Sequence, residues 1–328
     1  MGDDAPSVAQ YRQPPILTAE ADNRARLRPR LRYNRALVTI VLSGCSVSDR
    51  LFVLLQYLTP KLALTRFAGF VAGNDWGAVT QWIIRRFIRK YGVNMAEAAD
   101  PAPTAYNTFN AFFTRALRAD ARPLAQAALV CPVDGAVSQL GAIEADQIFQ
   151  AKGHSYSTTA LVGGDAQLAA QFQNGQFATI YLSPKDYHRI HMPCAGRLTR
   201  MIYVPGELFS VNPATARGVP GLFARNERVV CVFEGEAGPF VMVLVGATIV
   251  GSMATAWHGV VNPPRSKAVR EWRYDDQQVK LQQGDEMGRF LLGSTVVLLF
   301  PGRDAAFNPG WAAGTAVRMG EVMAAANG

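Results

Sequence analysis

The sequence predicts an α+β protein: a β-rich, largely antiparallel domain that follows a set of amphipathic N-terminal helices. Residues 36–122 show the periodicity of helices, whereas from residue 123 onward short apolar runs alternate with glycine, proline and asparagine. Apolar residues make up 49% of the 328-residue chain and charged residues 18%. This composition supports a sizeable core and argues against global disorder.

The overall charge predicts an anionic partner. The net charge is +8, and both nucleic acid and acidic lipid attract a basic protein. The sequence has no RNP1 strand and no paired Cys/His finger, so we expect a lipid surface and no nucleic acid. Acidic Asp3 and Asp4 follow Met1, which argues against a signal peptide. The cysteines are widely spaced without a CxxC motif, and this predicts a reducing compartment and no disulfide framework.

Residues 1–35 are polar and rich in proline and arginine, and we expect a basic, flexible arm. Six arginines crowd its second half. They are Arg24, Arg26, Arg28, Arg30, Arg32 and Arg35. Like-charge clusters often act as tails that bind polyanions, but a solvated linker explains the composition equally well.

Residues 36–122 are expected to hold helices that contact a membrane. In "AVTQWIIRRFIRKYG" (78–92), one half of the helical wheel is apolar and the other half carries the basic residues and Trp82. Such a helix suits a membrane interface, although packing on a core is the commoner reason for the pattern. The preceding "LFVLLQYLTPKLALTRFAGFVAG" is unusually apolar, and its charges, Lys61 and Arg66, are both positive. Together these segments favour an anionic bilayer.

Short apolar runs in residues 123–328 predict strands. The clearest are "ATIYLS" (178–183), "MIYV" (201–204), "RVVCVFE" (228–234) and "TVVLLF" (295–300). One helix is expected around "DAQLAAQFQNG" (165–175). The apolar span 237–264 contains several glycines and suits two buried strands better than a transmembrane helix. The protein is therefore expected to touch a membrane without crossing it.

Two of the four histidines stand in one phrase, "YLSPKDYHRIHMPCAG" (181–196). Histidine is easily tuned to move protons near neutral pH, so His188 and His191 are candidate acid–base groups. With Cys194 they also form an HxxHxxC spacing. A structural zinc site needs a fourth ligand, however, and His154 and His258 stand apart. We therefore expect no metal.

The phrase "FLLGSTVVLLF" (290–300) is expected to form one buried strand, interrupted by Gly293 and Ser294. Glycine inside a strand marks a bulge or a close backbone approach, and a buried hydroxyl needs a partner. Asp134 stands in a Val-Asp-Gly turn. Together, Asp134, His191 and Ser294 could supply the orienter, the base and the attacking hydroxyl of a nucleophilic triad.

Two electrophiles fit this triad. A serine hydrolase would attack an external ester, but its serine usually lies in a G-x-S-x-G elbow, which Ser294 lacks. The carbonyl of Gly293 is nearer, and glycine eases attack because it has no Cβ. The peptide bond would become an ester, β-elimination would leave a dehydroalanine, and hydrolysis with loss of ammonia would give a pyruvoyl group. A membrane-binding protein without catalysis is a third reading.

Between about residues 50 and 300 the sequence resembles the phosphatidylserine decarboxylase proenzymes of the membrane-associated bacterial type. The matching phrases occur in order: "LQYLTPKLALTRFAG", "CPVDGAVSQLG", "AKGHSYS", "YLSPKDYHRIHMPCAG", "YVPGELFSVNP", "LFARNERVVC", "VGATIVGS" and "GDEMGRFLLGSTV". "LGST" alone would be weak, but the ordered set is specific. The arm 1–35 lies outside the resemblance, and His258 stands where the family pattern has a small residue.

The resemblance implies a self-processing enzyme. Cleavage between Gly293 and Ser294 would give a β chain, 1–293, and an α chain, 294–328, that begins with the pyruvoyl group. Asp134 and His191 match the maturation residues of the family, and His188 matches the histidine associated with decarboxylation. The pyruvoyl group would form a Schiff base with the amine of phosphatidylserine. Loss of CO2 would then give phosphatidylethanolamine.

The sequence patterns and the resemblance together give the expected organisation. The arm 1–35 would precede a membrane-associating helical region, 36–122, and a β-rich catalytic domain, 123–328. The enzyme would be peripheral on the cytoplasmic face of the cell membrane, its β and α chains would stay together, and a homodimer is a family expectation. The pyruvoyl group would be its cofactor, without a metal.

Overall fold

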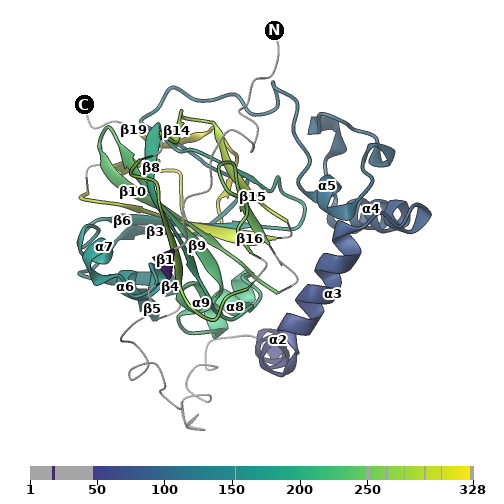
Figure 1. Cartoon of the computed structure of the whole chain (residues 1–328), viewed down its shortest axis with the longest axis horizontal. Helices are drawn as coiled ribbons and strands as arrows, with labels where there is room; N and C mark the ends of the chain where they lie inside the picture. Colours follow the sequence, from purple (N-terminus) through teal and green to yellow (C-terminus); the bar gives the residue numbers. More distant parts are fainter. Residues whose placement is uncertain are drawn as a thin grey trace.

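The structure is a computed structural model that describes residues 17–18, 47–151, 153–248, 252–262, 265–276, 278–291, 293–303 and 305–325. After the short strand β1 (Leu17–Thr18), helices come first in this part of the chain, and strands make up most of the rest (Figure 1). The helices are α2 (Val47–Leu58), α3 (Lys61–Gly73), α4 (Ala78–Tyr91), α5 (Phe109–Phe113), α6 (Thr158–Leu161), α7 (Ala166–Ala170), α8 (Pro213–Gly218) and α9 (Leu222–Arg225), with the 3-10 turns η2 (Met95–Glu97) and η3 (Pro103–Ala105).

Most strands belong to one large antiparallel sheet, so the predicted α+β class is confirmed. The strands are β1 (Leu17–Thr18), β2 (Leu129–Val130), β3 (Gly135–Ala142), β4 (Gln147–Ala151), β5 (His154–Ser157), β6 (Gln176–Leu182), β7 (Arg189–His191), β8 (Gly196–Val204), β9 (Arg228–Gly235), β10 (Gly238–Val245), β11 (Met253–Thr255), β12 (Gly259–Val260), β13 (Arg270–Arg273), β14 (Lys280–Leu281), β15 (Glu286–Phe290), β16 (Ser294–Phe300), β17 (Ala306–Phe307), β18 (Ala316–Val317) and β19 (Val322–Ala325). The ten-stranded sheet runs β1-β13-β8-β9-β10-β16-β6-β3-β18, with β14 paired to β8. Smaller sheets run β12-β11-β15-β7, β17-β19-β2 and β4-β5.

The side chains of β16 alternate between two apolar cores, one on each face of the large sheet. Val296 and Leu298 pack in one core together with Phe290, whereas Val297 and Leu299 pack in the other. Successive side chains of a strand point to opposite faces, so a strand covered on both sides needs an unbroken apolar run. This explains the continuous apolar letters after Thr295.

The stretch 290–300 forms two strands, not the single strand that the sequence predicts. β15 ends at Phe290 in the four-stranded sheet, and β16 begins at Ser294 in the ten-stranded sheet. Gly293 therefore lies where the chain passes from one sheet to the other. The apolar pattern does not reveal this change, because both flanking strands are buried.

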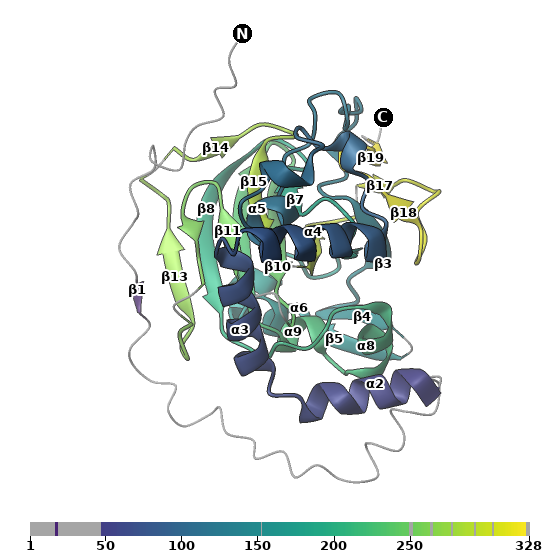
Figure 2. The same cartoon turned by 90° about the vertical axis from the view of Figure 1, so that its right-hand side faces the viewer.

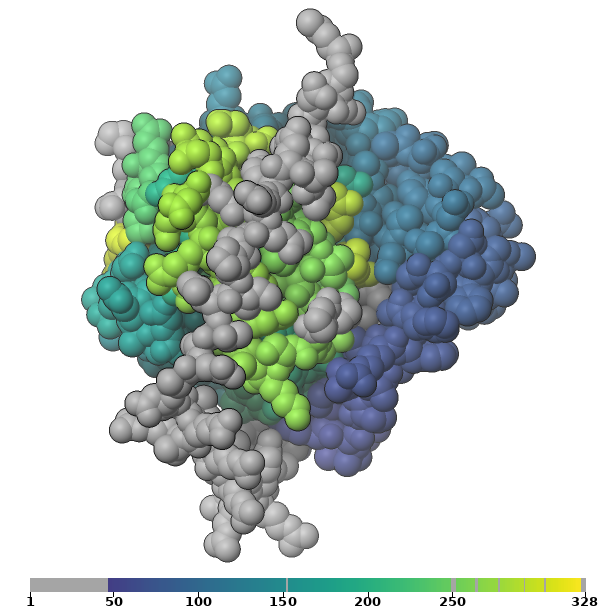
Figure 3. Space-filling model, in the orientation of Figure 1, coloured from purple at the N-terminus to yellow at the C-terminus, as the bar shows by residue number. Residues whose placement is uncertain are grey.

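Helices α2, α3 and α4 lie along one side of the β core (Figures 2 and 3). The apolar face of α4 packs on an aromatic cluster around α5, where the Phe87 and Phe109 ring centroids are 5.1 Å apart. Core packing thus accounts for much of the amphipathic pattern of α4. The exposed apolar side chains of α2 and α3 are Val47, Leu51, Leu54, Leu55, Tyr57, Leu58, Leu62, Leu64, Phe67 and Phe70.

The structure bears on three further expectations, which concern the arm 1–35, the cysteines and membrane-spanning helices. The predicted arm 1–35 lies outside the described residues, apart from β1, which pairs with β13. Cys131, Cys194 and Cys231 are free thiols, and Cys45 lies outside the described residues. In the part of the chain that the structure describes, no helix is long and apolar enough to cross a bilayer.

Candidate active site

The strand register brings Ser294 to the segment that carries the two histidines. Ser294 pairs with Leu182, the last residue of β6. From Leu182 the chain runs on to His188, whose carbonyl oxygen accepts the Phe290 N–H at 3.1 Å. Only residues 291–293 separate Phe290 from Ser294. Leu182 thus lies next to Ser294, and His188 lies next to Phe290. The chain from Leu182 to His188 therefore spans the same gap as the chain from Phe290 to Ser294.

Ser294 is buried with an unsatisfied hydroxyl. It is 1% exposed, and its Oγ has no hydrogen-bond partner among the described residues. A buried hydroxyl in this state costs about 1–3 kcal/mol. No partner holds the Ser294 hydroxyl away from the adjoining half-buried Gly293 carbonyl, so the hydroxyl can turn toward it.

His191 lies at the end of β7 as a neutral base. Its Nδ1 is 2.7 Å from the Gly284 carbonyl oxygen, which can only accept, so Nδ1 carries the proton. Its Nε2 then accepts from the Tyr187 hydroxyl at 3.0 Å. Burial lowers the pKa of His191, while the Gly284 carbonyl opposes the shift. This tautomer leaves Nε2 as the basic atom.

His188 is a second neutral imidazole, and it is fully buried. Its Nδ1 donates to the Asp186 carbonyl at 2.8 Å, and its ring packs on Phe113 with centroids 4.0 Å apart. Burial lowers its pKa to about 3, and the nearby Arg115 guanidinium adds to this effect. Nε2 has no partner in the described chain. It is therefore a buried, unsatisfied acceptor.

Asp134 does not contact His191 in this structure. Its carboxylate accepts from Arg122 Nε at 2.9 Å and Nη2 at 2.5 Å, and from the Met319 N–H at 2.9 Å. Arg122 also pairs with Glu97 at 2.7 Å. The Gly284 carbonyl thus fixes the His191 tautomer, where the sequence suggested Asp134.

We expect Arg122→Met to destabilise the fold by about 3–5 kcal/mol, because Asp134 would remain as an uncompensated buried charge. The measurement is urea unfolding of the uncleaved Ser294→Ala chain carrying each substitution. Arg118→Met is the matched control: Arg118 pairs with Asp120 at 3.3 Å on the surface, where such pairs contribute about 0–1 kcal/mol. Equal losses in the two variants would show that Asp134 does not depend on Arg122.

Sequence reasoning missed several polar groups at this corner. Tyr187 directly precedes His188 in the phrase 181–196, and this position is the signal that could have marked it as a site residue. Arg115 is 4% exposed and donates to the Lys185 carbonyl at 3.3 Å, yet nothing in its sequence context marks it. Arg122 likewise shows its role only once the fold places it beside Asp134.

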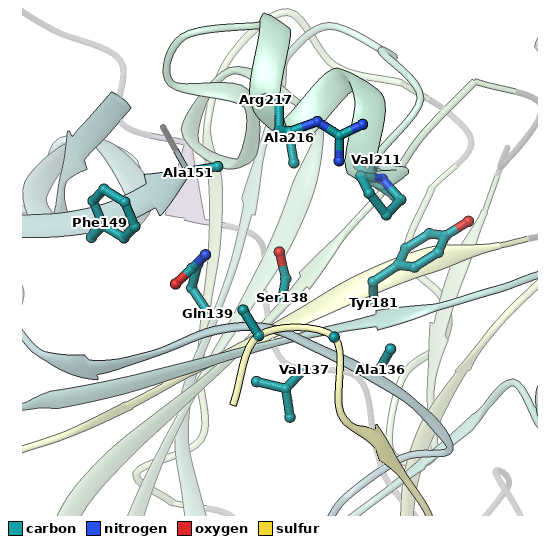
Figure 4. A pocket seen from close by; sticks show the side chains of 13 residues that line it. Ala136, Val137, Ser138, Gln139, Phe149, Ala151, Tyr181, Val211, Ala216 and Arg217 are labelled. Carbon is teal, nitrogen blue, oxygen red and sulfur yellow. The ribbon is translucent and has the colours of Figure 1, made fainter. Parts of the chain in front are cut away.

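A cavity of about 370 Å³ lies between β3 and β6 on one side and residues 211–217 on the other (Figure 4). Tyr181 forms part of its wall and pairs with Thr295. Tyr181 is thus on the strand next to β16, and its side chain points to the opposite face of the sheet from the Ser294 side chain. Among its described lining residues, Arg217 alone carries a charge.

The HxxHxxC spacing does not form a metal centre in this structure. His188 and His191 bond backbone carbonyls through Nδ1. Within the described residues, no group of three or more His, Cys, Asp or Glu side chains could hold a metal ion.

Comparison with known proteins places the chain in a family. The phosphatidylserine decarboxylase profile matches residues 109–325, more than half of the chain, and a second profile described as PSD matches residues 51–92. The chain belongs to the phosphatidylserine decarboxylase family. A phosphatidylserine decarboxylase proenzyme of Polaromonas naphthalenivorans is 76% identical over 281 residues, which cover 85% of this chain and 97% of that protein.

Two further relatives agree with this placement. Phosphatidylserine decarboxylase proenzymes of Methylibium petroleiphilum and Variovorax paradoxus are 73% and 74% identical over 278 residues, covering 85% of this chain and 98% of each relative. Membership of the phosphatidylserine decarboxylase family confirms the resemblance seen in the sequence. The hydrolase and non-enzymatic readings are not supported, because these relatives are decarboxylase proenzymes.

Proposed function

We propose that this chain is a self-processing enzyme that converts phosphatidylserine to phosphatidylethanolamine and CO2, using a pyruvoyl group made from Ser294. The Gly293–Ser294 bond carries the proposal: Ser294 pairs with Leu182, which directly precedes the segment with the two buried histidines, in a chain 76% identical to a phosphatidylserine decarboxylase proenzyme. The test is whether the purified protein, added to phosphatidylserine vesicles, releases CO2 and forms phosphatidylethanolamine.

The residues around Ser294 fit a pyruvoyl group. Thr295 Oγ1 and His188 Nε2 are buried without partners in the described chain, so polar atoms are present that a ketone or a bound substrate could engage. Once formed, the pyruvoyl group supplies a carbonyl that captures the substrate amine and an electron sink for the carbon that loses CO2.

Self-cleavage begins with proton abstraction from Ser294, for which His191 Nε2 is the proposed base. Oγ then attacks the Gly293 carbonyl carbon, and the C–N bond breaks to give an ester. β-Elimination breaks the Cβ–O bond, leaving a carboxylate on Gly293 and a dehydroalanine at residue 294. Water converts its imine tautomer to the ketone and releases ammonia. Burial lowers the pKa of His191, and the Glu286 carboxylate and, more weakly, the Asp134 carboxylate oppose this shift, so Asp134 makes a small contribution to the protonated form that this step produces.

We expect self-cleavage to continue at pH values below the ordinary histidine pKa of 6.5. Burial lowers the pKa of His191, so its basic form persists as the pH falls. The measurement is the rate at which freshly translated chain is converted to two fragments between pH 5 and pH 8. Half-maximal cleavage at or above pH 6.5 would contradict His191 as the base.

His188 is the proposed proton carrier of the decarboxylation step. Its lowered pKa keeps it neutral at rest, so it cannot donate a proton until it has first received one. Condensation of an ammonium group with a ketone to a neutral imine would release one water and one proton, and His188 Nε2 can accept that proton. It can then protonate the carbon from which CO2 has left.

We propose peripheral membrane attachment through α2 and α3, with the basic face of α4 near anionic headgroups. Leu51, Leu54, Phe67 and Phe70 are each more than half exposed, which is unusual for so many large apolar side chains on neighbouring helices. Arg85, Arg86, Arg89 and Lys90 lie exposed on α4. Apolar insertion and charge attraction together would hold the enzyme against its lipid substrate.

The double variant Leu54→Glu/Phe67→Glu should bind anionic vesicles at least about tenfold more weakly, because each charge opposes apolar insertion. Co-sedimentation with phosphatidylglycerol vesicles measures this, and self-cleavage should stay complete. Val322→Glu is the control, since Val322 is an exposed apolar residue of β19. Unchanged binding of the double variant would contradict attachment through these helices.

A further inference from the structure

The cavity between β3, β6 and residues 211–217 has one charged wall. Arg217, in the last turn of α8, lines it opposite Ser138 and Tyr181 (Figure 4). The remaining described lining is mostly small or apolar, so an anion inside would have this guanidinium as its cationic partner. An arginine fork matches the geometry of phosphate and carboxylate oxygens.

Arg217 is also tied to the helix that displays apolar residues. Its Nη2 is 2.6 Å from the Asp49 carboxylate in the first turn of α2. The Gln56 side chain of the same helix accepts the Ser210 backbone N–H at 3.0 Å, so α2 also holds the loop that precedes α8. The charged wall of the cavity is thus bonded to the helix with the most exposed leucines.

This position fits one group of the proposed lipid substrate. In phosphatidylserine the phosphodiester lies between the amino acid headgroup and the acyl chains. An anion site that is lined by the strand next to β16 and ion-paired to a helix with exposed leucines therefore fits the phosphodiester. An arginine on the carboxylate would stabilise the group that must leave as CO2, and would oppose the reaction. The phosphodiester keeps its charge throughout.

Resting on the proposed function, we infer that Arg217 binds the phosphodiester of the lipid substrate and that Asp49 competes with the lipid for it. Tyr181 of the cavity wall pairs with Thr295, the residue next to 294, and lies on the face opposite the serine side chain. Cleavage releases residue 294 from Gly293, and the new chain end can then turn toward the cavity. Arg217 is accordingly a substrate-binding residue that takes no part in self-cleavage.

Kinetics of the mature enzyme in mixed micelles provide the first test. Arg217→Gln should raise the KM for phosphatidylserine about tenfold or more and change kcat by less than about threefold, because the phosphodiester charge is unchanged by the reaction. The KM of Arg217→Lys should lie between the KM values of the wild type and of Arg217→Gln. Asp49→Asn should lower the KM, because the competing carboxylate charge is removed. Complete self-cleavage in each variant shows that it has folded.

Amine trapping gives a readout that needs no turnover. Cyanoborohydride should reduce the imines that glycerophosphoethanolamine and ethanolamine form with the α chain of the wild type, and so attach both amines covalently. Glycerophosphoethanolamine should be trapped at a lower concentration than ethanolamine. The intact mass of the α chain measures both products. In Arg217→Gln, the ratio between the concentrations of ethanolamine and glycerophosphoethanolamine needed for trapping should fall about tenfold, because one charge-assisted contact to the phosphodiester is lost. Arg303→Gln is the control, because Arg303 is an exposed arginine that does not line the cavity.

The outcomes separate this inference from the proposed function. If Arg217→Gln leaves the difference between the two amines unchanged, Arg217 does not bind the phosphodiester. If Arg217→Gln raises the KM for phosphatidylserine but leaves the trapping of glycerophosphoethanolamine unchanged, Arg217 binds the carboxylate. That result also overturns the inference. A wild type that traps neither amine would overturn the proposed function and this inference with it.

Discussion

Ser294→Ala should give one uncleaved chain with no detectable decarboxylase activity. The substitution removes the only atom of residue 294 that can attack the Gly293 carbonyl, so neither the ester nor the ketone can form. Ser294 lies at the start of β16 with its hydroxyl unbonded, and losing that hydroxyl breaks no hydrogen bond of the described chain. Denaturing gels and intact mass measure cleavage, and phosphatidylethanolamine formation measures activity.

The matched control for this prediction is Ser252→Ala. Ser252 lies close by, since its backbone carbonyl accepts the Leu291 N–H at 3.1 Å, and the substitution leaves that carbonyl in place. We expect this variant to cleave and to decarboxylate normally. Normal processing of Ser294→Ala would refute the cleavage site.

The two histidines should fail at different stages. His191→Ala should remain uncleaved or cleave about 10²–10⁴-fold more slowly, because a general base contributes about that much. His188→Ala should cleave fully, yet decarboxylate about 10²–10⁴-fold more slowly, since the carbon left by CO2 would lack its proton donor. The measurements are the cleavage rate of newly made chain and the kcat of the cleaved enzyme.

His154→Ala is the control for both variants, because His154 lies in the separate β4–β5 hairpin. It should cleave and turn over at the wild-type rate. Loss of cleavage in His188→Ala, with cleavage retained in His191→Ala, would mean that the two roles are reversed.

Much of the fold could be predicted from local patterns. Val296 to Phe300 and the 228–234 run were recognisable as strands, because buried strands have characteristic composition. The break at Gly293 could not be predicted, because it depends on which sheet each apolar run joins. The packing of α4 on Phe109 was also hidden, since a lipid surface and an aromatic core select the same helical pattern.

In the candidate site, too, some features could be predicted from local sequence, whereas others depend on the fold. Ser294 and the two histidines could be named from chemistry and from the resemblance, and the strand register brings their segments together. The partner of Asp134 could not be predicted, because Arg122 reaches it through a fold that no local pattern encodes. Burial likewise decides that His188 rests neutral, and sequence alone does not fix the depth of a side chain.

The most direct test of the account is the intact mass of active, purified protein. We expect two chains that end and begin at the Gly293–Ser294 bond, the smaller covering residues 294–328. Its mass should be lower by one ammonia than that of the unmodified peptide, and its N-terminus should resist Edman degradation. A fully active preparation consisting of one continuous chain with an intact serine at position 294 would contradict the central claim.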